Sequence, residues 1–203
     1  GYTQSKFDAC LFQRGNPSKG DFAILVVYVD DILCFTNSAA MHTAIYNVLD
    51  AKYGLDDRGQ LHFYRSLQFD HNTSNGSWKI SQSDYTKDII AAADMQTCKS
   101  VTSPENGIFL SVADCATDAQ MQAPGYAAFH DLFRKLLGML IYLGCSFRCD
   151  IMHALKGPSA ATSRPGVLHM EAIKRIIRYL QGSCTQSLTL SGPLGPPVLH
   201  MFS

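Results

Sequence analysis

Two adjacent aspartates interrupt one of the most hydrophobic stretches of this 203-residue sequence, LVVYVDDILCF at positions 25–35. The run DFAILVVYV (21–29) is β-branched and aromatic, which is typical of a strand buried on both faces. ILCFT (32–36) predicts the returning strand, which leaves Asp30 and Asp31 as the turn of a hairpin. The sequence therefore predicts two like charges at the tip of an otherwise apolar hairpin.

The two carboxylates repel each other, and partial burial raises the free-energy cost of ionising both. A divalent cation relieves this repulsion, because hard oxygen ligands suit Mg²⁺, which also keeps room for substrate phosphates. In a two-metal site one ion activates the attacking oxygen and the other stabilises the leaving phosphate; a third acidic ligand normally completes the site. The alternative is a structural turn, in which Asp is simply a good turn former. From the residues alone, both interpretations stay open.

Further strand and helix signals follow the first hairpin. Asn37-Ser38 offers an N-cap for a helix that Gly54 ends. Residues 61–82 predict a second hairpin with Asn75-Gly76 as its turn, and a short helix after it. Residues 98–124 are rich in Ser, Thr, Pro, Asp and Gln without periodicity, which predicts a linker or long loop.

The second half of the chain is predicted to be helical and basic. A long apolar helix is expected over 126–147, and residues 163–182 have the clearest amphipathic pattern. Residues 1–124 carry 9 Lys and Arg against 14 Asp and Glu, whereas residues 125–203 carry 8 against 3. This asymmetry indicates an anionic partner for the second half, with an ordinary solvated basic face as the alternative.

The composition, 46% hydrophobic and 17% charged, is typical of a globular protein. The longest apolar run (136–145) is shorter than the roughly 20 residues of a membrane span, so no membrane partner is expected. Seven scattered cysteines suit reduced thiols in an intracellular protein, of the cytoplasm or the nucleus. Cys145, Cys149 and His153 share one helical spacing, but coincidence is the preferred interpretation because structural zinc wants four ligands.

The YVDD motif (28–31) between two apolar strands resembles the signature of reverse transcriptases, whose palm carries two of three catalytic aspartates on a strand–turn–strand. The wider pattern resembles the copia-type retrotransposon branch of that family. The blocks that fall in the order and spacing of this branch are SKFDACLF (5–12), GQLHFYRSLQF (59–69), WKISQSDYTKDII (78–90), FRKLLGMLIYL (133–143), RCDI (148–151) and PGVLHMEAIKRIIRYLQGS (165–183). The resemblance covers nearly the whole chain outside residues 98–124.

The resemblance implies an α+β fragment of a polymerase. Its expected parts are a partial palm, with an antiparallel sheet and the YVDD hairpin (1–97), a linker (98–124), a mainly helical thumb (125–185) and a connector towards a missing ribonuclease H domain (186–203).

The resemblance also implies roles for single residues. Asp30 would be a metal ligand for nucleotide addition and Asp31 its partner carboxylate, with Mg²⁺ as the ion and Mn²⁺ as an alternative. The residues near the primer end and the incoming nucleotide would be Tyr28, Val29, Phe63, Tyr64 and Leu67. The family's thumb rests on the template–primer duplex, which implies phosphate contacts, with a solvated helix face as the alternative, for Lys174, Arg175 and Arg178.

Departures from the family pattern predict that the chain alone does not polymerise. The first palm aspartate belongs to a strand upstream of Gly1, and Ser203 precedes any ribonuclease H acid, so the missing polymerase and ribonuclease H segments are expected partners. The family's Phe-Leu-Gly appears as Tyr64-Arg65-Ser66, without the glycine that lets backbone approach closely. Gly157 and Pro158 fall where the family is helical, although proline inside a helix costs about 3 kcal/mol. For His169, which keeps the family's spacing from a proline, packing or capping is expected.

Three hypotheses follow for the function. The leading one is a retrotransposon-derived piece of an RNA-directed DNA polymerase, a nucleotidyltransferase that uses two metal ions, deoxynucleotides and an RNA or DNA template–primer. The alternative is a non-catalytic nucleic-acid-binding remnant that uses basic thumb helices. The third is that the isolated chain does not fold, because half a palm leaves sheet edges unpaired and apolar surface exposed.

Overall fold

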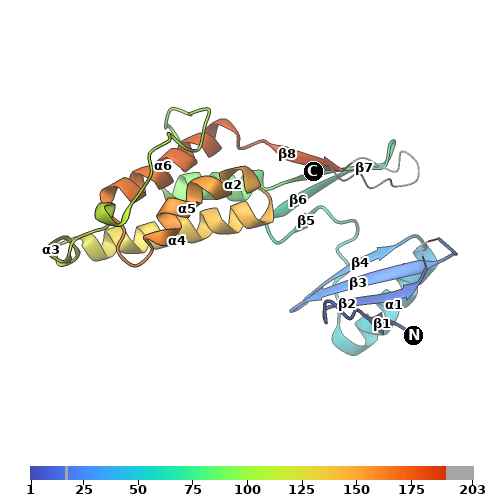
Figure 1. Ribbon diagram of the computed structural model, residues 1–203. Coiled ribbons are helices and arrows are strands. Elements are labelled where there is room, and N and C mark those ends of the chain that lie inside the picture. Colours follow the sequence, from blue (N-terminus) through green and yellow to red (C-terminus); the bar gives the residue numbers. More distant parts are fainter. Residues whose placement is uncertain (17, 191–203) are drawn as a thin grey trace, which may run out of the picture. The chain divides into compact units, whose positions relative to one another are not determined.

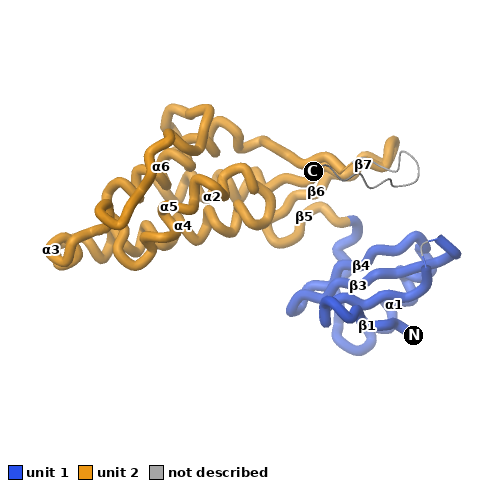
Figure 2. Tube along the Cα trace, in the orientation of Figure 1, with its two compact units in different colours: residues 1–60 blue, residues 61–203 orange. Residues whose placement is uncertain are grey.

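The computed structural model describes residues 1–16 and 18–190 of the protein (Figure 1). These residues form two antiparallel four-stranded sheets and six α-helices, which confirms the predicted α+β class. Contacts divide the chain into two compact units, residues 1–60 and the residues from Leu61 onward (Figure 2). The second hairpin therefore groups with the helices, whereas the sequence pattern had grouped it with the first hairpin. Most of the predicted connector, residues 191–203, lies outside the described residues.

The first unit is a four-stranded sheet with one helix. Its strands pair antiparallel in chain order: β1 (Thr3–Gln4), β2 (Leu11–Gly15), β3 (Phe22–Tyr28) and β4 (Asp31–Thr36). Helix α1 (Ala39–Tyr53) follows and contacts β3 and β4. The Ser38 hydroxyl caps it by accepting from the Met41 N–H at 3.3 Å, and Gly54 ends it in the left-handed conformation, as predicted.

The core of the first unit is small. Among its described apolar residues, only Ala23 and Leu25 are buried, and no residue of α1 is buried. Leu25 lines an apolar pocket of about 250 Å³ together with side chains of α1. Alternate residues of a strand point to opposite faces, so Ile24 and Val26 point away from this pocket, and both are half-buried. The prediction that β3 is buried on both faces is therefore wrong for these residues, because one helix covers one face.

The second sheet has the order β5-β6-β7-β8, with β5 (Phe63–Tyr64), β6 (Leu67–Asn72), β7 (Ser77–Ser81) and β8 (Ser187–Leu190). The predicted hairpin at Asn75-Gly76 is confirmed: Gly76 has a φ of 69°, and its N–H donates to the Asn72 carbonyl at 2.8 Å. The rings of His71 and Trp78 stack across this hairpin with centroids 4.1 Å apart and planes 7° from parallel.

The helices of the second unit pack around the main hydrophobic core. They are α2 (Ser83–Ala92), α4 (Tyr126–Ser146), α5 (Met152–Ala160) and α6 (Val167–Gly182), with the short 3-10 helix η2 (Cys149–Ile151) before α5. Helices α4 and α6 confirm the two apolar periodicities. Among the largest fully buried side chains of this core are Phe133, Leu136, Leu140, Leu143, Ile173, Ile176, Ile177 and Leu180. In the described part of the chain, no helix has the length and hydropathy of a membrane span.

Helix α5 runs through Pro158, which corrects the expectation that Gly157 and Pro158 oppose a helix there. Pro158 lies two residues before the end of the helix, so the hydrogen bond that it cannot donate is one of the last in the ladder. Its side chain is buried, and this burial offsets part of the cost. Gly157 packs closely, because a Cβ there would approach the Leu110 side chain to 3.0 Å and that side chain would have to shift.

Residues 98–116, here called the strap, run beside α6 (Figure 1). Near the C-terminal end of α6, the Arg178 Nε donates to the Lys99 carbonyl at 2.9 Å. At the other end, the Ala116 N–H donates to the Arg164 carbonyl at 3.0 Å. The segment 98–124 is mostly irregular, as its composition indicates, apart from the 3-10 helix η1 (Val112–Asp114) and the short helix α3 (Asp118–Met121). It is nevertheless held against the helices at both ends of the strap.

Candidate functional site

Asp30 and Asp31 lie at the tip of the β3–β4 hairpin. Tyr28 pairs with Asp31 across the hairpin, so the turn consists of Val29 and Asp30 rather than of the two aspartates. The one-residue difference arises because Val29 takes the positive φ, 54°, that a two-residue hairpin turn requires, while Asp31 begins β4. One carboxylate therefore projects from a turn and the other from the first residue of a strand.

Val29 holds a backbone conformation that β-branched residues rarely adopt. In this turn Val29 has a positive φ and Asp30 does not. This is the pattern of a type II′ turn, in which glycine usually occupies the first central position. The conformation costs about 1–2 kcal/mol. The Val29 side chain is 85% exposed, so little packing offsets that cost. Strain of this kind next to two carboxylates is typical of functional sites.

The two aspartates are exposed, so solvent screens their repulsion and the hairpin needs no cation in order to form. Their carboxylate oxygens are nevertheless the ligand type that Mg²⁺ and Mn²⁺ prefer. In residues 1–16 and 18–190, no group of three or more His, Cys, Asp or Glu side chains is placed to hold a metal ion. The pair therefore fits a divalent ion as part of a larger ligand set.

Strand β4 is an outer strand of its sheet, and Asp31 is its first residue. Its sequence, DILCFT, contains neither lysine nor proline, the residues that commonly protect an exposed edge from pairing. The other outer strand, β1, has two residues. A further strand added to the β4 edge would place its own side chains next to Asp31.

The predicted primer-binding residues fall in two places: Tyr28 and Val29 lie at the tip of the β3–β4 hairpin in the first unit, and the other three lie in the short β5–β6 hairpin of the second unit. Tyr64 pairs with Leu67, both half-buried, whereas Phe63 is exposed. Arg65 and Ser66 form the turn with φ of 48° and 63°, the type I′ pattern that favours glycine. The family has a glycine at the position of Ser66. This chain therefore lacks that glycine at a position where its backbone is left-handed. From α4, the Tyr142 hydroxyl donates to the Arg65 carbonyl at 2.8 Å and holds the turn in place.

The three cations predicted to contact phosphates have different environments on α6. Lys174 forms an ion pair with Glu171 at 3.0 Å. Arg178 donates from Nε to the Lys99 carbonyl of the strap. The Nε of Arg175 is buried and has no hydrogen-bond partner among the described residues. The structure therefore does not bring the three together as one free basic face, and their phosphate contacts stay a prediction.

A second basic surface, on α4, was missed by the sequence reasoning. Arg134, Lys135 and Gly138 are exposed on this helix, and neither cation has an ion pair within the described part of the chain.

Gly138 lies in the middle of a 21-residue helix, where glycine costs about 1 kcal/mol relative to alanine. A Cβ at Gly138 would meet no atom within 4 Å, so packing inside the described chain does not require the glycine. A glycine at this position lets a partner's backbone approach closely. The signal in the sequence was a glycine inside an apolar helical run.

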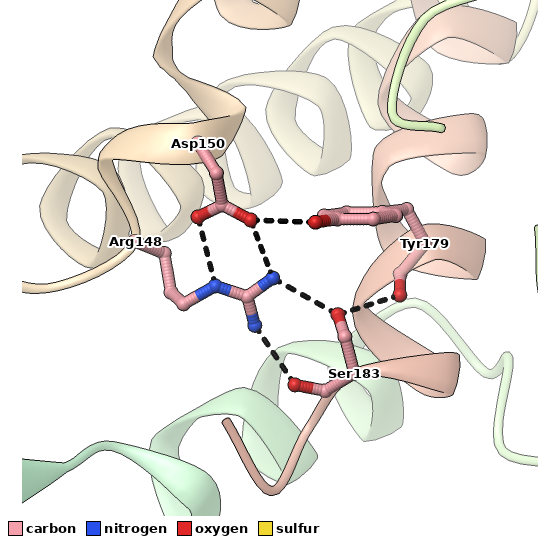
Figure 3. A network of polar contacts seen from close by, with 4 residues as sticks. All are labelled: Arg148, Asp150, Tyr179 and Ser183. Atoms are coloured by element: carbon pink, nitrogen blue, oxygen red, sulfur yellow. Dashed lines mark hydrogen bonds and ion pairs between the residues drawn. The ribbon is translucent and has the colours of Figure 1, made fainter. Parts of the chain in front are cut away.

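A polar network joins the ends of α4 and α6 (Figure 3). Arg148 binds both carboxylate oxygens of Asp150, at 2.9 and 2.7 Å, and donates to the Ser183 carbonyl at 3.0 Å. The Tyr179 hydroxyl donates to Asp150 at 2.8 Å. Cys149 stands where the family's Arg-Pro-Asp has its proline, and Arg148 and Asp150 on either side of it still bind each other.

His169 caps the start of α6, as expected. Its Nδ1 accepts a hydrogen bond from the Gly166 N–H at 3.1 Å. The side chain is buried, which lowers the pKa of His169, while the charge of Asp114 opposes this effect.

A sequence model of the family described as "Reverse transcriptase (RNA-dependent DNA polymerase)" matches residues 1–106, which include both hairpins. The chain belongs to the reverse transcriptase family. Its curated relatives are retrovirus-related Pol polyproteins of transposons, which place it in the copia-type retrotransposon branch.

All three of these polyproteins come from plants. The chain is 27% identical over 203 residues to the polyprotein from transposon TNT 1-94 of Nicotiana tabacum, a match that covers all of this chain and 15% of that protein. It is 29% identical over 197 residues to the polyprotein from transposon RE1 of Arabidopsis thaliana, a match that covers 94% of this chain and 12% of that protein. An uncharacterized mitochondrial protein of Arabidopsis thaliana is 26% identical to this chain over 164 residues, a match that covers 81% of this chain and 63% of that protein. No solved structure matches the chain.

Proposed function

We propose that this protein is a segment of an RNA-directed DNA polymerase, in which the β3–β4 hairpin contributes Asp30 and Asp31 to a divalent-metal site. The observation that carries this proposal is the pair of exposed carboxylates at the tip of the hairpin, within the YVDD motif of a reverse transcriptase chain. The substrates are deoxynucleotides and an RNA or DNA template–primer. The second unit corresponds to the primer-holding hairpin and the thumb.

The two aspartates have different parts in this site. Asp31 belongs to β4, so the strand fixes its position, and the strained Val29 turn sets the direction in which Asp30 projects. Bound Mg²⁺ or Mn²⁺ would stabilise the charge that develops on the phosphate oxygens. The third carboxylate of the site comes from a strand that pairs with the free edge of β4, since that edge is the one next to Asp31. On its own the chain supplies two carboxylates and does not polymerise.

Primer extension tests this proposal. With an RNA template, a DNA primer, deoxynucleotides and Mg²⁺, the 203-residue chain alone is expected to add no nucleotide. A chimera that carries the upstream segment of the Nicotiana tabacum relative is expected to extend the primer. Asp30→Asn in this chimera is expected to abolish extension, because the amide lacks the negative charge that the metal ion needs.

Asp56→Asn is the matched control, because Asp56 is an exposed aspartate in the segment that follows α1, outside the hairpin. The chimera is expected to keep its activity with this change. Extension by the 203-residue chain that Asp30→Asn removes would contradict the need for a third carboxylate. Extension by the chimera that survives Asp30→Asn would contradict the metal-binding role of the hairpin.

A second function, binding of a nucleic-acid duplex, is favoured by the exposed face of α4. Arg134 and Lys135 supply charge for phosphates, and Gly138 leaves room for the sugar–phosphate backbone. This function does not depend on Asp30, so the two proposals can fail separately.

Replacing Gly138 by alanine is expected to move stability and binding in opposite directions. The free energy of unfolding should rise by about 1 kcal/mol, because alanine is the better helix former. Affinity for a DNA–RNA duplex should fall, because the methyl group occupies the space that the backbone approaches. Denaturant unfolding and fluorescence anisotropy at 50 mM salt measure the two effects.

The charge variants Arg134→Ala and Lys135→Ala should weaken duplex binding and flatten its dependence on salt by about one unit of log–log slope for each lost phosphate contact. Lys174→Ala removes the same charge from a residue that is already paired with Glu171, and should change binding less. Unchanged affinity in Gly138→Ala, or a larger loss in Lys174→Ala than in Arg134→Ala, would argue against the α4 surface.

A further inference from the structure

The C-terminal part of the strap, residues 111–116, is fixed closely against the start of α6. The Ala116 N–H donates to the Arg164 carbonyl at 3.0 Å. The Asp114 carbonyl lies so near Gly166 that a Cβ on this glycine would come within 2.1 Å of the oxygen. The Asp114 carboxylate accepts from the Ser111 N–H at 2.7 Å and from its hydroxyl at 2.9 Å, which closes η1.

His169 contacts Gly166 from the α6 side of this contact. Its ring is 2% exposed, and Nδ1 accepts from the Gly166 N–H at 3.1 Å. An accepting Nδ1 carries no proton, so the neutral ring has its proton on Nε2. Protonation of His169 would turn Nδ1 into a donor that faces the donor of Gly166. It would also place a charge in a buried position. Both changes oppose the docked arrangement.

The titratable groups on the elements around His169 compensate that charge only in part in the docked state, because burial outweighs the charge of Asp114. Arg164 is paired with Asp118 at 2.7 Å, and the Tyr126 hydroxyl donates to the Pro165 carbonyl at 3.2 Å. The nearest opposite charge is Asp114, which is already bound to Ser111. The remaining titratable groups of these elements are Cys115 beside η1, then His130, Asp131, Arg134, Lys135, Tyr142 and Cys145 on α4, His153 and Lys156 on α5, and Glu171, Lys174, Arg175, Arg178 and Tyr179 on α6.

We propose that His169 is a pH-sensitive latch, and that its protonation releases Gly166 and residues 111–116 of the strap from the start of α6. The rest of α6 stays in place, because its core side chains, Ile173, Ile176 and Ile177, are apolar and fully buried. In the released state water hydrates the imidazolium.

The direction of the pH effect follows from burial. Burial lowers the pKa of His169 below its usual value of 6.5, so the docked state binds this proton less tightly than the released state. The latch is therefore fully engaged above pH 6.5 and disengages as the pH falls through the lower pKa of the docked state. Asp114 stays ionised over this range, because its hydrogen bonds from Ser111 lower its pKa below 3.8.

Amide hydrogen exchange of the full chain at pH 7.5 and pH 5, corrected for intrinsic rates, tests the latch. We expect the amides of Gly166 and Ala116 to lose protection at pH 5, by up to about tenfold for each pH unit between 6.5 and the lower pKa of docked His169. The amide of Val101, which binds the Arg178 carbonyl at the other end of the strap, should keep its protection, as should that of Ile176.

His169→Gln keeps an acceptor for Gly166 but does not titrate, so the difference between the two pH values should disappear. His153→Gln is the matched control, because His153 pairs with Glu105 of the strap, and the effect at Gly166 should persist in it. Should His169→Gln not fold, the loss of Gly166 protection must level off at the pH midpoint of the NMR titration of the wild-type ring. Equal protection at both pH values, a pH effect that survives in His169→Gln, or a disagreement between these two pH values would overturn the latch.

Discussion

Replacing Arg148 by alanine is expected to lower the free energy of unfolding of the second unit by about 3 kcal/mol. Removing one partner of a buried ion pair costs about 3–5 kcal/mol, and the lower end applies because the Asp150 side chain keeps 36% of its exposure. The guanidinium is nearly fully buried, and its loss also leaves the Ser183 carbonyl without its donor (Figure 3). Denaturant unfolding followed by far-ultraviolet circular dichroism measures the change.

The pH dependence provides an internal check on this network. Burial raises the pKa of Asp150, but the hydrogen bonds from Arg148 and Tyr179 and the charge of Arg148 outweigh burial and hold the pKa below 3.8. The carboxylate therefore contributes stability above pH 3.8 and loses it as the pH falls through the lower folded-state pKa. The stability difference between wild type and Asp150→Asn should shrink between pH 6 and pH 3.

Lys174→Ala is the matched control for Arg148→Ala. Lys174 also forms an ion pair on the second unit, but it is exposed, so its loss should change the free energy of unfolding by about 0.5 kcal/mol or less. If Arg148→Ala were as stable as wild type, the network would contribute nothing to the fold. An Asp150→Asn difference that is constant with pH would mean that the carboxylate is not held ionised by its partners.

Gly166→Ala is expected to destabilise the second unit by about 2–3 kcal/mol, at the upper end of the usual cost of overpacking. The backbone of Gly166 is extended, with φ of −94° and ψ of 177°, and alanine adopts this conformation readily. The cost therefore comes from the collision alone. A Cβ would lie 2.1 Å from the Asp114 carbonyl oxygen, and that backbone atom moves only if η1 leaves α6.

Thermal unfolding and the exchange of the Ala116 amide measure this effect. The glycine-to-alanine change at position 138 is the matched control, because its Cβ meets no neighbouring atom and it should stabilise the protein. A Gly166→Ala variant with wild-type stability and a protected Ala116 would show that the strap accommodates the methyl group.

The elements with strong periodicity were predictable from the sequence. The apolar runs predicted α4 and α6, and Asn75-Gly76 predicted the turn between β6 and β7. These signals can be read from the sequence because they depend only on residues that are neighbours in the chain. The first hairpin was predicted with its turn one residue too late. Which two of Val29, Asp30 and Asp31 form the turn depends on the cross-strand pairing, and moving the turn by one residue changes every cross-strand partner by two positions.

Features that depend on distant contacts were not predictable. Arg148 meets Ser183 across 35 positions of sequence, and neither residue belongs to a periodic pattern. The strap is held largely through backbone groups, such as the carbonyls of Lys99 and Arg164, which any residue provides. Helix α5 includes Pro158 because burial at the end of the helix outweighs local preference. In the candidate site, the motif singled out Asp30 and Asp31, and their catalytic role stays a prediction.

The tryptophan in the stack of His71 and Trp78 is an intrinsic fluorescence probe of the protein. Trp78 is the only tryptophan of the chain and lies in the second unit, so indole emission follows the unfolding of that unit and is silent about the first. Far-ultraviolet circular dichroism follows both. Non-coincident transitions in the two signals would identify separate unfolding of the units. Because Trp78 lies on β7, its emission also follows the β6–β7 hairpin without any label.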